Sequence, residues 1–183
     1  MAYPSTPASY FHLLRWKVYG KLTRPLVVFT PKSLLRNKAA ASKKADFTSG
    51  TFRAVIGDPS VNPASVKTVL LCSGKVYYDL VAHREKTGAN DVAIIRVERL
   101  YPIPHKTLPL ALAGMENAEV RWVQEEPANQ GAWSFMAMNL PGILQRPITG
   151  VSRPSSSSPA VGVHARHDEE QHTLVEQAFA PRG

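Results

Sequence analysis

The stretch TVLLCSGKVYYDLVAHREKTGANDVAIIRV, residues 68–97, determines the fold that we expect for this chain. Residues 68–72 and 92–97 are short, mostly apolar runs, which are typical of buried strands. Between them, residues 76–86 have the composition of a helix, and Gly88 provides a stop signal. Two apolar strands joined by a helix predict a β-α-β unit with parallel strands.

The same alternation continues toward the C-terminus and predicts a mainly parallel sheet with helices on both faces, which is an α/β fold. Pro141 is expected to end one helix, and the serine-rich and proline-rich residues 153–159 are expected to form a loop. The expected elements are helices over residues 108–113, 132–139 and 169–179 and strands over residues 120–123 and 148–151.

The first third of the chain has a different organisation. A hydroxyl N-cap followed by proline predicts a helix over residues 8–19, and the apolar residues 26–30 are expected to form a buried strand. Residues 32–66 have the basic, polar composition of a linker, with a short strand over 51–56.

The helix expected over residues 8–19 allows two interpretations. Phe11, Leu14 and Val18 have the spacing of a packed amphipathic face, which we favour. The alternative is that aromatic residues such as Trp16 stack on nucleic-acid bases while Arg15 and its basic neighbours contact phosphates.

Charge is distributed unevenly along the 183 residues. Residues 1–60 hold ten Lys or Arg and two acidic residues, whereas the remainder holds twelve of each, so the net charge of +8 lies in the first third. Such a segment is typical of a surface facing nucleic acid or an acidic partner. The single cysteine excludes an internal disulfide and a Cys-x-x-Cys site. No apolar run is long enough for a membrane span, so we expect a cytoplasmic protein.

The segment CSGK, residues 72–75, connects the first expected strand to a helix. Ligands bind beyond such strand ends in parallel sheets, and backbone N–H groups there could hold an anion. The alternative, which we favour, is that Gly74 only permits the tight turn and that Lys75 is solvated. Cys72 is expected to be a buried apolar residue rather than a nucleophile.

The segment QEEPANQGAW, residues 124–133, places two carboxylates, three amides and a tryptophan at a strand end. Glu125 and Glu126 would suit acid–base catalysis if burial raised the pKa of one of them. Adjacent strand residues point to opposite faces, so we instead expect them to cap a helix or to pair with Lys or Arg across an interface. The residues expected to support an interface or an active site are Gln124, Glu125, Glu126, Asn129, Gln130 and Trp133.

Three histidines, His164, His167 and His172, lie close together near the C-terminus. Histidine is the commonest metal ligand. However, His164 precedes the expected helix, and no acidic residue completes a metal site at a fixed spacing. We therefore expect solvated histidines and no bound metal.

Five segments, in order and spacing, resemble the C-terminal part of the thiamine-diphosphate-dependent 2-oxoglutarate dehydrogenase component. The resemblance covers nearly the whole chain and is closest to actinobacterial members; the QEEPANQGAW segment separates it from pyruvate and branched-chain enzymes. The segments are PSTPASYFHLLR (4–15), RPLVVFTPKSLLR (24–36), CSGKVYYDL (72–80), DVAIIR with LYP (91–102) and QEEPANQGAW (124–133).

This resemblance implies a transketolase C-terminal-like domain over residues 67–183. It is preceded by an interdomain linker over residues 32–66 and by the last helix and strand of a pyrimidine-binding domain in residues 1–31. In the intact enzyme the implied reaction is oxidative decarboxylation of 2-oxoglutarate, with thiamine diphosphate and Mg²⁺, and succinyl transfer to lipoamide. The family's cofactor and substrate motifs have no counterpart here, so we expect a fragment that is inactive alone, without catalytic, cofactor-binding or metal-binding residues.

The implied partners are a second copy of the full-length enzyme and the lipoyl-bearing succinyltransferase component, with neither nucleic acid nor membrane. The alternative is a stand-alone, flavodoxin-like module that binds a nucleotide or nucleic acid through its basic N-terminal third. A steep loss of affinity with salt would identify that alternative, because phosphate contacts release counterions.

Overall fold

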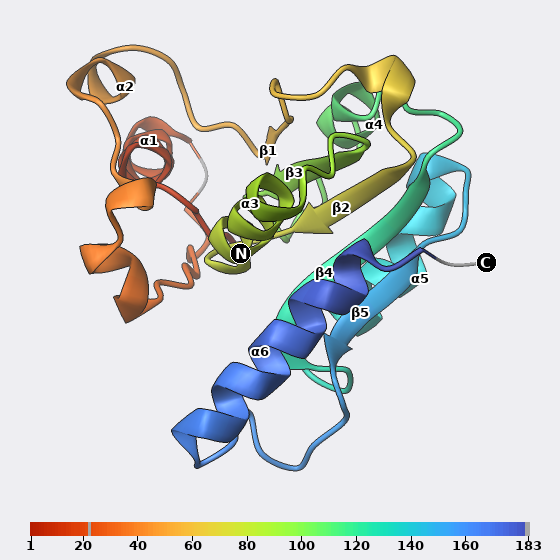
Figure 1. Cartoon of the computed structure of the whole chain (residues 1–183). Helices are drawn as coiled ribbons and strands as arrows, with labels where there is room; N and C mark the ends of the chain where they lie inside the picture. Colours follow the sequence, from red (N-terminus) through yellow and green to blue (C-terminus); the bar gives the residue numbers. More distant parts are fainter. Residues whose placement is uncertain (22, 182–183) are drawn as a thin grey trace.

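The computed structural model describes residues 1–21 and 23–181. Its centre is a five-stranded sheet with the strand order β1-β3-β2-β4-β5 (Figure 1). All neighbouring strands run parallel except β1, which is antiparallel to β3, so the mainly parallel α/β sheet is confirmed. The strands are β1 (Val55–Ile56), β2 (Thr68–Cys72), β3 (Val92–Val97), β4 (Glu119–Pro127) and β5 (Thr149–Arg153).

Helices cover both faces of the sheet. α3 and α6 lie in front of it in Figure 1, and α4 and α5 lie behind it. The N-terminal third, with α1 and α2, forms a separate lobe beside the β1 edge. The helices are α1 (Pro7–Tyr19), α2 (Lys44–Thr48), α3 (Val76–Thr87), α4 (Thr107–Ala111), α5 (Trp133–Leu144) and α6 (His164–Phe179), with short 3₁₀ turns at Lys32–Arg36, Lys38–Ala40 and Pro63–Ser65.

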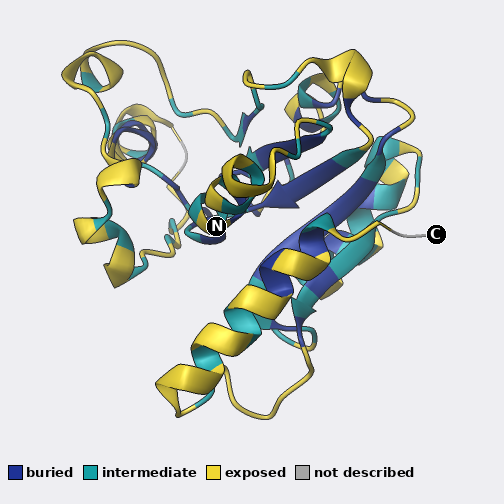
Figure 2. Ribbon diagram, in the orientation of Figure 1, coloured by how far each residue is buried: buried dark blue, intermediate teal, exposed yellow. Residues whose placement is uncertain are grey.

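Each face of the sheet has its own hydrophobic core, because successive side chains of a strand point to opposite sides. In β2, Leu70 and Cys72 belong to the core under α3 and α6. Val69 and Leu71 belong to the core under α4 and α5. The central strands are therefore buried on both sides, while the outer helix faces are exposed (Figure 2). The β2–β4 pairing keeps one register, from Thr68 opposite Glu119 to Cys72 opposite Val123.

Two predictions for the N-terminal third are wrong. Residues 26–30 form no buried strand: Val28 makes a single bridge to Ala2, and Val27 and Phe29 are 48% and 41% exposed. The buried face of α1 consists of Ala8, Ser9, His12 and Leu13, whereas Phe11, Leu14 and Val18 are exposed. The physical reason is that hydroxyl groups at the start of α1 hydrogen-bond to a buried carboxylate on the sheet, which fixes the rotation of the helix.

Two helix boundaries also differ from prediction. α5 continues through Pro141 to Leu144, since Leu140 is fully buried and the last turn packs against the sheet. α6 begins at His164, five residues earlier than expected, because Arg153 of β5 binds side chains of its first turns. No helix in residues 1–21 or 23–181 combines the length and the apolar character that crossing a membrane requires.

Candidate functional site

The carboxyl ends of β2 and β4 form the topological switch point of the sheet. β2 continues into α3 on one face, and β4 continues into α5 on the other, so the connections leave the sheet in opposite directions. Ligands bind at such a crevice in open parallel sheets. The two segments that the sequence marks as candidate sites, residues 72–75 and 124–133, meet here because β2 and β4 are neighbours.

Tyr3 occupies the turn that follows β2. Gly74 has a φ of +68°, and a Cβ at this position would overlap the Tyr3 ring. The Tyr3 hydroxyl hydrogen-bonds to the backbone of Lys75; burial, together with the charges of Glu125 and Glu126, raises the pKa of Tyr3 to about 12. The turn therefore receives a neutral phenol, which supports the tight-turn interpretation rather than an anion site.

The two adjacent glutamates point to opposite faces of β4, as strand alternation predicts. Glu125 pairs with Lys75, which corrects the expectation that Lys75 is solvated. Burial raises the pKa of Glu125, and Lys75 opposes this shift. Glu126 lines a cavity on the other face instead. The two carboxylates do not form a cooperative acid–base pair.

Gln124 connects the strand end to the following helix, and it is 4% exposed. Its Oε1 accepts hydrogen bonds from Trp122 Nε1 at 3.1 Å and from the backbone N–H of Trp133 at 2.7 Å. Its Nε2 donates to the Gln130 carbonyl at 2.7 Å and also to the carbonyls of residues 126 and 127. One side chain thus provides hydrogen-bond partners for several backbone groups between β4 and α5.

Asn129 and Gln130 bind the serine-rich loop that follows β5. Asn129 donates from Nδ2 to the Ser156 carbonyl and accepts from the Ser156 N–H, both at 3.0 Å. Gln130 donates to the carbonyls of Ser156 and Ser158. Trp133 packs directly over Gly150, where a Cβ would overlap the indole. These three residues therefore have assigned structural partners within the chain.

A largely apolar cavity of about 490 Å³ opens at the same sheet end. Its walls include aromatic rings from three parts of the chain, of which Tyr3 lies near Phe29 and Tyr101 lies near Phe135. Glu126 is the charged side chain in this lining, and Tyr101 is 57% exposed. The arrangement offers an apolar contact surface with one carboxylate.

A second polar cluster joins the end of β3 to the start of α1, and sequence reasoning missed it. Glu98, at the end of β3, is completely buried and accepts hydrogen bonds from the Ser5 hydroxyl at 2.5 Å and the Ser9 hydroxyl at 2.6 Å. Arg96 donates to the same Ser5 hydroxyl at 3.0 Å. Burial raises the pKa of Glu98. The detectable signal was a glutamate directly after an apolar strand, but its partners lie about 90 residues away.

Cys72 and the three histidines do not form a reactive centre. Cys72 is fully buried, and burial raises the pKa of its thiol to about 12, so the structural interpretation is supported. His164 and His172 pair with acidic residues one turn along α6, and His167 contacts Arg153. Within the described ranges, no three His, Cys, Asp or Glu side chains are placed to hold a metal ion.

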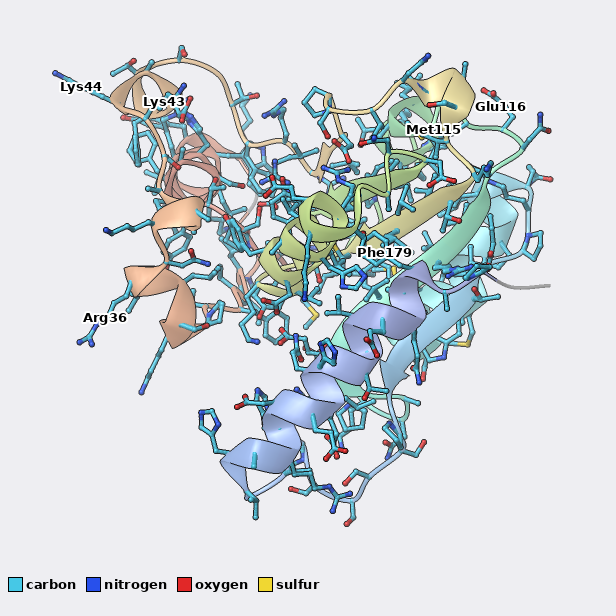
Figure 3. The ribbon with its side chains drawn as sticks, viewed as in Figure 1. Arg36, Lys43, Lys44, Met115, Glu116 and Phe179 are labelled. Carbon is cyan, nitrogen blue, oxygen red and sulfur yellow. The ribbon has the colours of Figure 1, made fainter. Side chains whose placement is uncertain are left out.

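The basic residues of the N-terminal lobe project into solvent. Arg36, Lys43 and Lys44 point outward in Figure 3 and are exposed. Arg15 instead donates to the Gly50 carbonyl at 2.6 Å, and Trp16 packs near Phe52. The aromatic and basic residues of α1 are thus partly engaged in holding the segment that leads to β1.

Comparison with known proteins gives a consistent family. A model of the 2-oxoglutarate dehydrogenase C-terminal family matches residues 41–179. The chain is 52% identical over 184 residues to the 2-oxoglutarate dehydrogenase E1/E2 component of Corynebacterium glutamicum, covering 98% of this chain and 15% of the relative. It is 49% identical over 184 residues to the E1 component of Cupriavidus necator, covering 97% of this chain and 19% of that protein.

A Multifunctional 2-oxoglutarate metabolism enzyme of Mycobacterium sp. (strain KMS) is 47% identical over 190 residues, covering 99% of this chain and 15% of the relative. The chain therefore spans between 15% and 19% of the length of these relatives. With a family match over most of its residues and near-complete coverage by these relatives, the chain belongs to the 2-oxoglutarate dehydrogenase family, as the C-terminal region of its E1 component.

Proposed function

We propose that this chain is the C-terminal part of an enzyme that decarboxylates 2-oxoglutarate oxidatively and transfers the succinyl group to lipoamide. The observation that carries the proposal is 47 to 52% identity to 2-oxoglutarate dehydrogenase proteins along almost the entire chain. In that enzyme the chain supplies scaffold and interface, and alone it is inactive. The partners are a second copy of the complete enzyme and, since one relative is named an E1/E2 component, the lipoyl-bearing succinyltransferase.

The proposed domain division is the one implied by the family resemblance of the sequence. Residues 67–183 form a transketolase-type C-terminal domain, residues 32–66 are the linker, and residues 1–31 complete a pyrimidine-binding domain. Two observations support this division. α1 lies outside the five-stranded sheet (Figure 1), and Val28 is paired only through an isolated bridge to Ala2. The apolar side chains Phe11, Leu14 and Val18 are exposed, which is typical of a surface that contacts another domain.

The cofactor of this reaction is thiamine diphosphate with Mg²⁺, and the residues present do not fit it. The described part of the chain offers no acidic cluster for the metal. The turn after β2, where a parallel sheet could receive a diphosphate, is covered by the Tyr3 ring and hydrogen-bonded to its hydroxyl. We therefore assign cofactor binding and catalysis to residues outside this chain.

Residues 124–133 order the surface next to the active site in this proposal. Gln124, Asn129, Gln130 and Trp133 are engaged in internal contacts, whereas Glu126 faces the open apolar cavity. A neighbouring domain would contact that cavity and its carboxylate. Replacing Glu126 by Gln in the complete enzyme should weaken dimerisation or turnover, whereas unchanged values of both would contradict this role.

A chimera tests the proposed function directly. The 183-residue chain replaces the matching segment of the Corynebacterium glutamicum protein, and 2-oxoglutarate-dependent reduction of an acceptor is measured. We expect activity in the chimera and none in the isolated chain. A dimeric, folded chimera without activity would contradict the proposal, and light scattering identifies that case. A control chimera with Gln124→Ala should lose activity through misfolding of the sheet end.

A further inference from the structure

The carboxylate of Glu126 has no partner within residues 1–21 and 23–181. The backbone carbonyl of this residue accepts from Gln124 Nε2, but neither a hydrogen bond nor an ion pair reaches its side chain. The nearby Lys75 is already paired with Glu125. The Glu126 side chain is partly buried and lines the apolar cavity at the end of the sheet. Removing a charge from water without pairing it is costly, so this carboxylate indicates that a cation is the missing partner.

Aromatic rings form much of the wall around this carboxylate. Tyr3 and Phe29 lie with their ring centroids 5.7 Å apart and are tilted by 47°. Tyr101 and Phe135 meet edge to face, with centroids 6.0 Å apart. Neither pair is stacked face to face, so the rings do not use up their faces on each other. The charge of Glu126 acts on the Tyr3 hydroxyl, which places the carboxylate beside the first pair. Ring faces next to a carboxylate attract an organic cation, because the π face is the negative side of the ring quadrupole.

The cavity is accessible and has the size of a ligand site. Its volume of about 490 Å³ lies within the range of cavities that hold a small ligand. Phe29 and Tyr101 are 41% and 57% exposed, so the cavity is open to solvent at these rings. The Met1 ammonium is also at the cavity, but it donates to the Tyr101 carbonyl at 2.7 Å and forms no ion pair with Glu126. The carboxylate therefore remains available to an incoming cation.

We propose that this cavity receives the guanidinium group of an arginine side chain from a neighbouring domain of the complete enzyme, an inference that rests on the function proposed above. The matched region makes up only 15 to 19% of the relatives, so the arginine comes from the much larger remainder of the enzyme. A guanidinium is planar and always charged, and it can stack on an aromatic face while it donates hydrogen bonds to Glu126. The contact joins the apolar rim and the single carboxylate in one recognition site.

Two small probes test the charge that the cavity recognises. N-acetyl-L-arginine amide carries the guanidinium, and N-acetyl-L-citrulline amide is the neutral control, because a ureido group of nearly the same size replaces it. Saturation-transfer difference NMR measures the dissociation constant of each probe for the 183-residue chain at constant ionic strength. We expect saturable arginine binding and about tenfold weaker citrulline binding, from the loss of the cation–π contact and the charge-assisted hydrogen bond. General attraction would not explain arginine binding, because the chain itself has a net charge of +8.

Matched variants locate the binding. Glu126→Gln keeps the shape of the side chain and removes its charge, so it should remove most of the preference for arginine over citrulline. Phe135→Leu removes an aromatic face and should weaken arginine binding about threefold. Glu85→Gln removes an exposed carboxylate of α3, on the opposite face of the sheet, and should change neither affinity. Equal affinities for the two probes, or equal effects of the two glutamine variants, would overturn the proposal.

The chimera described above tests the source of the cation. In the complete enzyme the neighbouring arginine already fills the cavity, so the arginine probe should not bind. Probe binding to an active chimera with the affinity of the isolated chain would overturn the assignment to a neighbouring domain. An active chimera together with an isolated chain that does not prefer arginine would overturn the cation site and leave the proposed function intact. An inactive chimera with selective probe binding to the isolated chain would support the cation site and contradict only the proposed function.

Discussion

Two glycines with the same backbone conformation show how single residues shape this sheet end. Gly74 and Gly88 both have a φ of +68°. Gly88 ends α3 in open space, whereas Gly74 lies against the Tyr3 ring. Gly88 therefore meets only a conformational requirement, whereas Gly74 also allows the N-terminal segment to cross the crevice.

Gly74→Ala and Gly88→Ala separate these two requirements. A left-handed conformation costs a non-glycine residue about 1 to 2 kcal/mol, so we expect Gly88→Ala to lower the free energy of unfolding by about 1 kcal/mol. Gly74→Ala should cost at least about twice as much, because the Tyr3 ring must move. Urea denaturation measures both. Combining each with Tyr3→Ala should remove the excess for Gly74 only, and equal costs for the two alanines would contradict this explanation.

Gln124 carries a prediction about hydrogen bonding. Gln124→Ala leaves the buried Trp122 Nε1 and several backbone groups of the turn without a partner. We expect a loss of about 2 to 4 kcal/mol in the free energy of unfolding, since each unsatisfied buried group costs about 1 to 3 kcal/mol. Gln130→Ala, which releases only loop carbonyls, should cost less than about 1 kcal/mol in the same denaturation experiment.

The buried Glu98 predicts how the stability of the fold depends on pH. Its pKa is raised in the folded state, so between its ordinary and its raised pKa the folded protein binds more protons than the unfolded chain. Stability contributed by this group therefore falls as the pH rises through that window. We expect Glu98→Gln to flatten the decrease in melting temperature above the ordinary glutamate pKa. A variant with the same pH dependence as the wild type would contradict this assignment.

At the scale of elements, the strands and helices that local sequence patterns encode could be predicted. The strands around residues 68–72 and 92–97 and the helix between them are confirmed, because apolar runs and a terminal glycine encode them directly. The other features depend on contacts between residues that are far apart in the sequence. Neither the Ser5–Glu98 bonds nor the Tyr3–Gly74 contact has a local pattern, so the orientation of α1 and the content of the crevice could not be predicted.

The wrong prediction that a helix ends at Pro141 also arises from tertiary contacts. Proline lacks the N–H that would reach the Ala137 carbonyl, yet burial of Leu140 and packing of the last turn keep α5 helical. We expect Pro141→Ala to raise the free energy of unfolding by about 1 to 3 kcal/mol, measured by urea denaturation. Pro147→Ala, outside the helix, is the matched control. A loss of stability in Pro141→Ala would mean that the proline ring contributes to the packing of α5 on the sheet.

At the scale of the whole molecule, the two lobes differ in how well they bury apolar side chains. The sheet lobe has two complete cores, whereas the exposed apolar residues of the N-terminal lobe include Phe11, Leu14, Val18 and Leu35. Apolar surface of this kind is typical of an interface. It agrees with the proposed position of residues 1–31 in another domain of the complete enzyme.

Light scattering tests this surface in the isolated chain. We expect self-association at micromolar concentration, because exposed apolar surface drives contact between copies. The double variant Leu14→Glu with Val18→Lys should shift the population toward the monomer without changing the circular dichroism of the sheet lobe. A wild-type chain that is already monomeric would show that this surface needs no cover.

The position of Ala2 has a consequence for the order in which parts of the chain fold during translation. Ala2 bridges to both Val28 and Arg99, and the neighbouring Ser5 binds Glu98. The ribosome adds about 5 to 20 residues each second, so residues 2–5 wait roughly 5 to 20 s before their partners Glu98 and Arg99 are synthesised. In that interval α1 has exposed apolar side chains and no sheet to hold it. Nascent-chain profiling should therefore detect chaperone contact that begins when α1 has emerged from the ribosome and ends only after Glu98 and Arg99 have emerged.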